Sequence, residues 1–213
     1  MRILAITPIV VSEEELARRQ TRYDRLSPAG VTVHLENIGD GDGAGVPHAL
    51  ETADDIAASE EALIDRCAAA DTERFDAFLP DCVLDPVLDH ADRVPLPVYG
   101  IGRLSAHYLA GFGWQIGAVA RNRAIAAEFD RKLASYGLPT TQPTAVMDLS
   151  VADVADAAGW TAAVERTVAR LNCRAVINAC SAVEVKQGSG GPLLLDPTAT
   201  ALRMLGALGE VAR

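Results

Sequence analysis

Short apolar segments alternate along the chain with longer segments in which apolar residues recur at helical spacing. The short segments are predicted strands, at residues 2–7, 31–36, 75–80, 97–100, 115–120, 144–147, 174–179 and 192–195. The longer segments are predicted helices, near residues 13–26, 53–70, 103–110, 122–136, 160–171 and 197–210. Alternation of strands and helices is typical of an α/β fold with parallel sheets.

The predicted strands divide into two sets of four. Residues 113–119 open the second set much as residues 1–6 open the first. We therefore predict a pseudo-repeat of two α/β lobes, with lobe 1 at residues 1–97 and lobe 2 at residues 98–191.

Two cysteines occupy corresponding places in the predicted lobes. Cys82 and Cys180 each follow an apolar strand, and the carboxyl ends of strands are where open α/β sheets bind ligands. We expect the two thiols to face one cleft, where they could act as an acid and a base on either side of one carbon. Cys67 and Cys173 fall in a predicted helix and a helix–strand connection, so we interpret them as packing or surface residues.

Composition favours a small-molecule partner. The chain has 213 residues, 49% of them hydrophobic, and its formal net charge of −10 opposes attraction to nucleic acid or to an anionic membrane. No apolar run approaches the roughly 20 residues that span a bilayer. The cysteines show no C-x-x-C spacing and the N-terminus enters a strand instead of a signal peptide, so we expect reduced thiols and a cytoplasmic protein.

No motif for a metal or an organic cofactor is found. The sequence has no H-x-x-x-H pattern and no Cys/His cluster. The glycine-rich segment 188–191 precedes a strand instead of opening a helix, so it lacks nucleotide-binding geometry and is interpreted as a flexible lid or connector. Residues 38–45, rich in glycine and aspartate, are predicted to form a loop.

Five short motifs occur in an order that is similar to one known family. They are the opening strand and helix start at 2–14, the cysteine segment at 81–88, the strand at 97–100, the second cysteine segment at 179–182 and the closing strand at 191–197. Together they resemble the aspartate/glutamate/hydantoin racemase superfamily, and most closely its hydantoin racemase-like branch.

This resemblance implies two pseudo-symmetric Rossmann-like lobes, each with a mainly four-stranded parallel sheet, and an active site between them. It implies that residues 192–213 return to complete lobe 1. It also implies catalysis without a metal or cofactor, in which Cys82 and Cys180 remove and return a proton on opposite faces of a carbon next to a carboxylate or carbonyl. Family analogy favours a homo-oligomer.

The predicted substrate-binding residues lie next to the strand ends, and they are Thr7, Pro8, Val83, Arg121, Ser181 and Ala182. Ser181 and Thr7 are candidate donors to a developing oxyanion, although both residue types are also common in turns and helix caps. The chain departs from the family where Thr7 replaces an asparagine and where Ala120 replaces a threonine that binds carboxylate. Arg121 or Arg123 could grip a carboxylate instead, or both could lie in the exposed first turn of a helix.

Three functions follow from these observations. The first is a racemase or epimerase acting on a hydantoin, an amino acid or a related small molecule. The second is a maleate-type cis-trans isomerase or a malonate-type decarboxylase on the same scaffold. The third is a non-catalytic relative that binds a metabolite.

Overall fold

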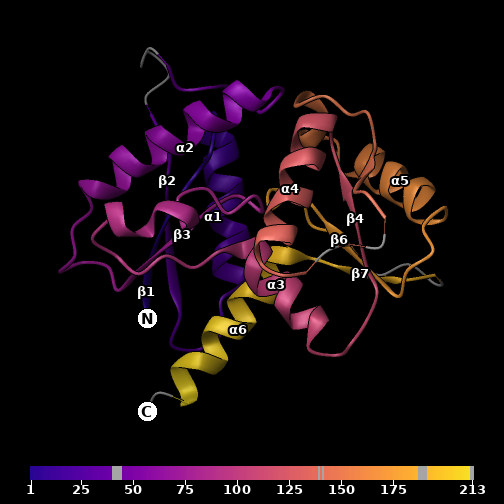
Figure 1. Cartoon of the computed structure of the whole chain (residues 1–213). Coiled ribbons are helices and arrows are strands. Elements are labelled where there is room, and N and C mark those ends of the chain that lie inside the picture. The colour runs from indigo at the N-terminus through magenta and orange to yellow at the C-terminus, as the bar shows by residue number, and fades with distance from the viewer. Residues whose placement is uncertain (40–44, 139, 141, 187–190, 212–213) are drawn as a thin grey trace.

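Two parallel sheets, each covered by helices, lie side by side in the computed structural model (Figure 1). The structure describes residues 1–39, 45–138, 140, 142–186 and 191–211. Most of the predicted loop at 38–45 and of the glycine-rich segment at 188–191 lies outside these residues. Among the described residues, no helix is both long and apolar enough to cross a membrane.

The first sheet has the strand order β2-β1-β3. Its strands are β1 (Arg2–Ile6), β2 (Thr32–Glu36) and β3 (Ala77–Pro80), and β1 pairs in parallel with both neighbours. The predicted fourth strand at 97–100 is reduced to a single bridge between Phe78 and Val98. The central strand is apolar because residues 3–6 are buried on both faces.

The second sheet has the order β5-β4-β6-β7 and is also parallel. Its strands are β4 (Ile116–Ala120), β5 (Ala145–Val146), β6 (Ala175–Asn178) and β7 (Leu193–Leu195). The placement of β7 differs from the prediction that residues 192–213 belong to lobe 1, because β7 pairs with β6. Only the helix after β7 returns to the first lobe.

Helices connect the strands in the order that hydrophobic periodicity predicts. They are α1 (Glu13–Leu26), α2 (Ala53–Ala68), α3 (Ile101–Ala110), α4 (Arg123–Ser135), α5 (Ala157–Val168) and α6 (Pro197–Val211). Side chains cap their first turns: Ser12 caps α1, Thr52 forms a capping box with Asp55 in α2, and Asn122 caps α4. Two short 3₁₀ helices, Leu88–Arg93 and Ala152–Ala155, were not predicted.

The two lobes share buried side chains. In α6, Ala201, Leu202 and Leu205 pack in the same cluster as Ile3 and Ala5 of β1, which ties the C-terminal helix to lobe 1. The segment after β3 makes the reverse connection, because its side chains, which belong to lobe 1, pack in the core of lobe 2.

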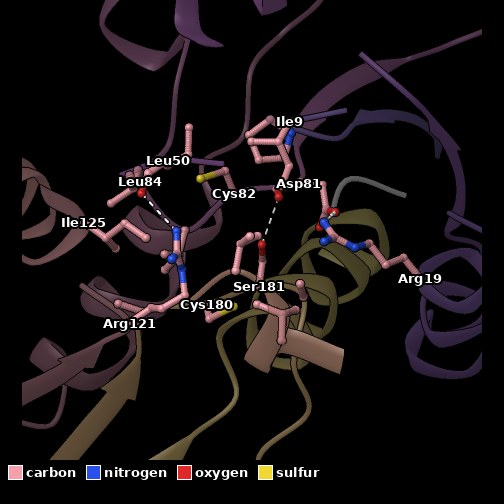
Figure 2. A pocket seen from close by; sticks show the side chains of 16 residues that line it. Ile9, Arg19, Leu50, Asp81, Cys82, Leu84, Arg121, Ile125, Cys180 and Ser181 are labelled. Atoms are coloured by element: carbon pink, nitrogen blue, oxygen red, sulfur yellow. Dashed lines mark hydrogen bonds and ion pairs between the residues drawn. The ribbon is translucent and has the colours of Figure 1, made fainter. Parts of the chain in front are cut away.

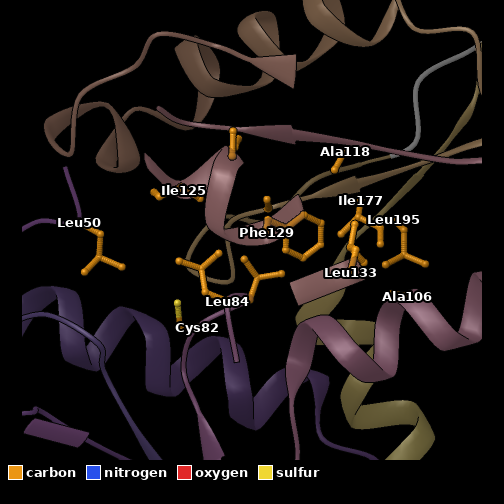
Figure 3. Close-up of a cluster of buried hydrophobic side chains, with 14 of the residues drawn as sticks. Leu50, Cys82, Leu84, Ala106, Ala118, Ile125, Phe129, Leu133, Ile177 and Leu195 are labelled. Carbon is orange, nitrogen blue, oxygen red and sulfur yellow. The ribbon is translucent and has the colours of Figure 1, made fainter. Parts of the chain in front are cut away.

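Cys82, Val83 and Leu84 belong to a cluster that also contains Phe129 of α4 and Ile177 of β6 (Figure 3). The first cysteine is thus held against the core of the second lobe.

The predicted pseudo-repeat is confirmed by the strand order. In each lobe the first strand is central, the second strand lies on one side and the third on the other, so β1, β2 and β3 correspond to β4, β5 and β6. Cys82 follows β3 and Cys180 follows β6. The two cysteines therefore occupy equivalent positions at the carboxyl ends of equivalent strands.

Candidate active site

The two cysteines sit in turns of the same geometry. The backbone N–H of Cys82 donates to the carbonyl of Pro80 at 2.7 Å, and the N–H of Cys180 donates to the carbonyl of Asn178 at 2.7 Å. Two residues further on, the backbone amides of Leu84 and Ala182 donate to the sulfurs of Cys82 and Cys180. Each thiol is thus fixed at the end of its strand by its own turn.

One cavity of about 80 Å³ reaches both thiols. Figure 2 shows Cys82 and Cys180 on opposite sides of it, with Arg121 at one end and Arg19 at the other. Its wall is mainly apolar, and it is formed by Pro8, Ile9, Arg19, Leu50, Asp81, Cys82, Val83, Leu84, Arg121, Ile125, Val151, Val154, Ala179, Cys180, Ser181 and Ala182. Except for Thr7 and for Arg123, the alternative to Arg121, every residue that the sequence predicted for the site lines this cavity.

Thr7 is fully buried beside the cavity wall and does not line it. Its hydroxyl donates to Asn37 at 3.2 Å and accepts from the backbone N–H of Ile38 at 3.1 Å. This side chain holds the chain that leaves β2 against the end of β1. We therefore leave Thr7 out of the proposed binding site.

Arg121 occupies the position after β4 that corresponds to Thr7 after β1. Its guanidinium donates to Glu51 at 2.5 Å and to the carbonyl of Leu50 at 3.0 Å. The charge is therefore neutralised within the protein, and the fork that could grip a carboxylate is directed to the segment before α2. Arg123 is exposed and does not line the cavity.

Arg19 also lines the cavity, although its position within a helical stretch of the sequence does not mark it as a site residue. It comes from α1 and donates to Glu15 at 2.7 Å and to Asp81, the residue before Cys82, at 3.0 Å. Both Arg19 and Asp81 are buried. Removal of either partner would leave the other as an uncompensated buried charge, so this pair is costly to break.

Other arginines of α1 hold the turn that contains Cys180. Arg18 donates to the carbonyl of Ala182 at 3.0 Å, Arg22 donates to the carbonyl of Ser181 and pairs with Asp196, and Arg25 pairs with Glu184. The sequence signal was the spacing of these arginines, at positions 18, 22 and 25, which places them on one face of a helix.

The carboxylate of Asp85 caps the first turn of α3. It accepts hydrogen bonds from the backbone N–H groups of Gly102 at 2.7 Å and Arg103 at 2.6 Å, and from the Tyr136 hydroxyl at 2.7 Å. Burial raises the pKa of Asp85 to about 6, against the effect of these donors. The turn of Cys82 is thereby joined to the start of α3.

Burial also raises the pKa of both cavity thiols. The amide of Leu84 opposes this for Cys82, whereas Asp81 and Asp85 raise the pKa further. For Cys180 the amide of Ala182 and the guanidinium of Arg19 oppose it.

The remaining cysteines lie elsewhere. Cys67 lies on the buried face of α2, where burial raises its pKa to about 12, and burial also raises the pKa of Cys173. Neither lines the cavity. Among the described residues, no group of three or more His, Cys, Asp or Glu side chains could hold a metal ion.

Comparison with known proteins points to one family. A family model described as Asp/Glu/Hydantoin racemase matches residues 29–205, which is most of the chain. Comparison with curated proteins gives no match.

Several solved structures share the fold. An allantoin racemase from Klebsiella pneumoniae is 19% identical with a TM-score of 0.75, over 100% of this chain and 89% of that one. An allantoin racemase from Pseudomonas fluorescens is 15% identical with a TM-score of 0.79, over 100% and 92% of the two chains. The maleate isomerase Iso from Pseudomonas putida S16 is 13% identical with a TM-score of 0.59, over 98% and 93%.

Proposed function

Because the chain belongs to the Asp/Glu/hydantoin racemase family, we propose that it is a cofactor-independent racemase or epimerase with Cys82 and Cys180 as its acid and base. The observation that carries this proposal is the position of the two thiols. They sit in equivalent turns, on opposite sides of one cavity. A planar carbanion or enolate between them can be reprotonated on either face.

The reaction removes one proton from the substrate carbon and adds one proton to the opposite face of that carbon. One cysteine, as thiolate, takes the proton from the substrate carbon, and the thiol of the other cysteine gives its proton to the opposite face. Between these two proton transfers, negative charge develops on the carbonyl oxygen next to the reacting carbon. The backbone N–H groups of Val83 and Ser181, each directly after a cysteine, have no hydrogen-bond acceptor in the part of the chain that the structure describes. They are our candidate donors to that oxygen.

The substrate that suits the cavity is uncharged. Both arginines in its wall are already paired, Arg19 with Glu15 and Asp81, and Arg121 with Glu51. A carboxylate that enters a mainly apolar cavity needs an uncompensated cation, because its lost hydration is otherwise not replaced. We therefore propose a small ring compound with a carbonyl next to the reacting carbon, such as a hydantoin. Allantoin, a hydantoin derivative, belongs in the test set because two of the similar structures are allantoin racemases.

Isotope exchange tests the function directly. Single enantiomers of hydantoins, allantoin and amino acids are incubated with the protein in heavy water, and optical rotation is followed together with deuterium at the reacting carbon. We expect racemisation with deuterium incorporation for the hydantoin class and no reaction for amino acids. Isomerisation of maleate, carbon dioxide release from an arylmalonate, or no reaction with any compound would contradict the proposal.

Cysteine variants test the two-base scheme. Cys82→Ala and Cys180→Ala should each reduce racemisation by at least about 100-fold, because general acid and base catalysis each contribute that much or more. Cys67→Ala and Cys173→Ala are the matched controls and should keep most of the activity, since neither residue reaches the cavity. Full activity in either of the first two variants would refute the scheme.

A further inference from the structure

Opposite charges surround the two cavity thiols. On the side of Cys82, Asp81 directly precedes the cysteine and Asp85 follows three residues later, and their exposed fractions are only 2% and 0%. Both carboxylates raise the energy of a thiolate at Cys82. The described charged groups that act most strongly on Cys82 are thus negative.

Cys180 faces the arginines of α1. Arg18 and Arg22 donate to the carbonyls of Ala182 and Ser181, within two residues of the thiol, and Arg19 shares the cavity wall with it. Asp81 is the carboxylate that faces Cys180 from the turn after β3. Glu15 pairs with Arg18 and Arg19, and Asp196 pairs with Arg22.

Of these arginines, Arg19 is best placed to act on the thiol. Arg22 is held by both carboxylate oxygens of Asp196, and the side chain of Arg18 is 45% exposed, so solvent screens it. Arg19 is buried and lines the cavity. Its Nη2 has no hydrogen-bond acceptor in the described part of the chain, whereas Nε and Nη1 are held by Glu15 and Asp81.

We propose that Cys180 is the thiol that loses its proton first, that it is therefore the base and Cys82 the acid in the free enzyme, and that Arg19 is the positioning residue that sets this order. The inference rests on the proposed function for its catalytic meaning. Abstraction starts at the sulfur of Cys180, and the proton from the thiol of Cys82 reaches the opposite face of the carbon. The negative charge then lies on Cys82, and proton exchange with water restores the starting state.

Alkylation by iodoacetamide measures the order without any substrate. The reaction is run across a range of pH, and the modified peptides are quantified by mass spectrometry, so that each cysteine gives its own pH midpoint. We expect the midpoint of Cys180 to lie about one pH unit or more below that of Cys82. Equal midpoints, or a lower midpoint for Cys82, would overturn the assignment.

Arg19 variants test the cause of the order. Arg19→Met should raise the midpoint of Cys180 by about one pH unit, and Arg19→Lys, which keeps the charge, should raise it less. Arg93→Gln is the control and should leave both midpoints unchanged, because Arg93 pairs with Glu61 at the surface and does not line the cavity. An unchanged midpoint in Arg19→Met would remove Arg19 from the scheme.

Arg19→Met removes the cation that pairs with the buried carboxylate of Asp81, although the Tyr23 hydroxyl still donates to it, and this risks misfolding, so a second variant is needed. The double variant Arg19→Met/Asp81→Asn removes both members of the buried pair. It should bring the midpoints of Cys82 and Cys180 closer together, and an undiminished separation would contradict the inference.

The outcomes separate the inference from the function. Midpoints in the expected order without racemisation of any compound would overturn the proposed function alone. Racemisation with midpoints in the reverse order would overturn the inference alone.

Discussion

The hydroxyl of Ser181 donates a hydrogen bond of 2.9 Å to the backbone carbonyl of Asp81. Ser181 follows one cavity cysteine and Asp81 precedes the other, so this bond joins the two cysteine turns across the lobe boundary (Figure 2). The carbonyl of Ser181 in turn accepts from Arg22 and from the hydroxyl of Thr198 at 3.1 Å. The separation of the two thiols therefore depends on this connection between the lobes.

Ser181→Ala should lower both activity and stability. The variant leaves the buried carbonyl of Asp81 without its donor, which should reduce the free energy of unfolding by about 1–2 kcal/mol. Racemisation should fall more than stability alone explains, because the thiols lose their fixed spacing. Urea denaturation and isotope exchange measure the two effects. Thr21→Ala is the control, since Thr21 makes a similar bond to Ala17 in α1, away from the cavity, and equal activity in both variants would contradict this role.

Glu51→Gln should make the cavity more receptive to anions. The substitution removes the partner that neutralises Arg121, while the carbonyl of Leu50 still orients the guanidinium. Because Glu51 is half exposed, the gain is modest, about 1 kcal/mol or about fivefold in the inhibition constant of a carboxylate analogue of the substrate. The constant of an uncharged analogue should not change.

Glu61→Gln is the matched control, because Glu61 pairs with Arg93 at the surface outside the cavity. Identical inhibition constants in Glu51→Gln and Glu61→Gln would show that the charge of Arg121 does not govern ligand choice.

Asp85 should make the protein less stable as the pH rises from about 4 to about 6. Its pKa is raised to about 6 in the folded chain from the ordinary value of 3.8, so the folded state binds the proton more tightly than the unfolded state. The stabilisation is complete below the ordinary pKa and is lost as the pH rises through the folded value. Two pKa units correspond to about 3 kcal/mol, which is the upper limit of the effect.

Asp85→Asn provides the comparison, because an amide cannot titrate and still offers an oxygen to the first turn of α3. The free energy of unfolding is measured by urea denaturation at several pH values for both chains. The difference between them should change in favour of the variant between about pH 4 and 6. A constant difference across this range would mean that Asp85 titrates normally.

Gly102→Ala should disturb the cavity, although Gly102 does not line it. A Cβ at this position would lie 2.1 Å from the carbonyl oxygen of Val83, which is backbone and cannot yield without moving the Cys82 turn. We expect a loss of about 1–3 kcal/mol in the free energy of unfolding and a lower rate of racemisation. Gly111→Ala, where a Cβ would meet ordinary contacts at 3.5 Å, is the control and should behave like the parent chain.

Local patterns in the sequence determined the repeating strands and helices and the equivalence of Cys82 and Cys180. These features depend on residues close together in the chain, since hydrophobic periodicity selects strand or helix and the strand end fixes the position of the next side chain. The same reasoning found most of the cavity wall, because the carboxyl ends of parallel strands meet at one edge.

Only the tertiary structure decided what the polar side chains do. Arg121 lies at a strand end, as predicted, but its charge is neutralised by Glu51, 70 residues away in the sequence. Arg19 reaches the cavity because α1 packs beside the turn of Asp81, 62 residues later. Likewise, β7 pairs in parallel with β6 in the second sheet, a pairing that local sequence patterns do not specify. Hydrogen bonds and ion pairs are short-range and directional, so their partners are set by which distant segments the packed lobes bring together.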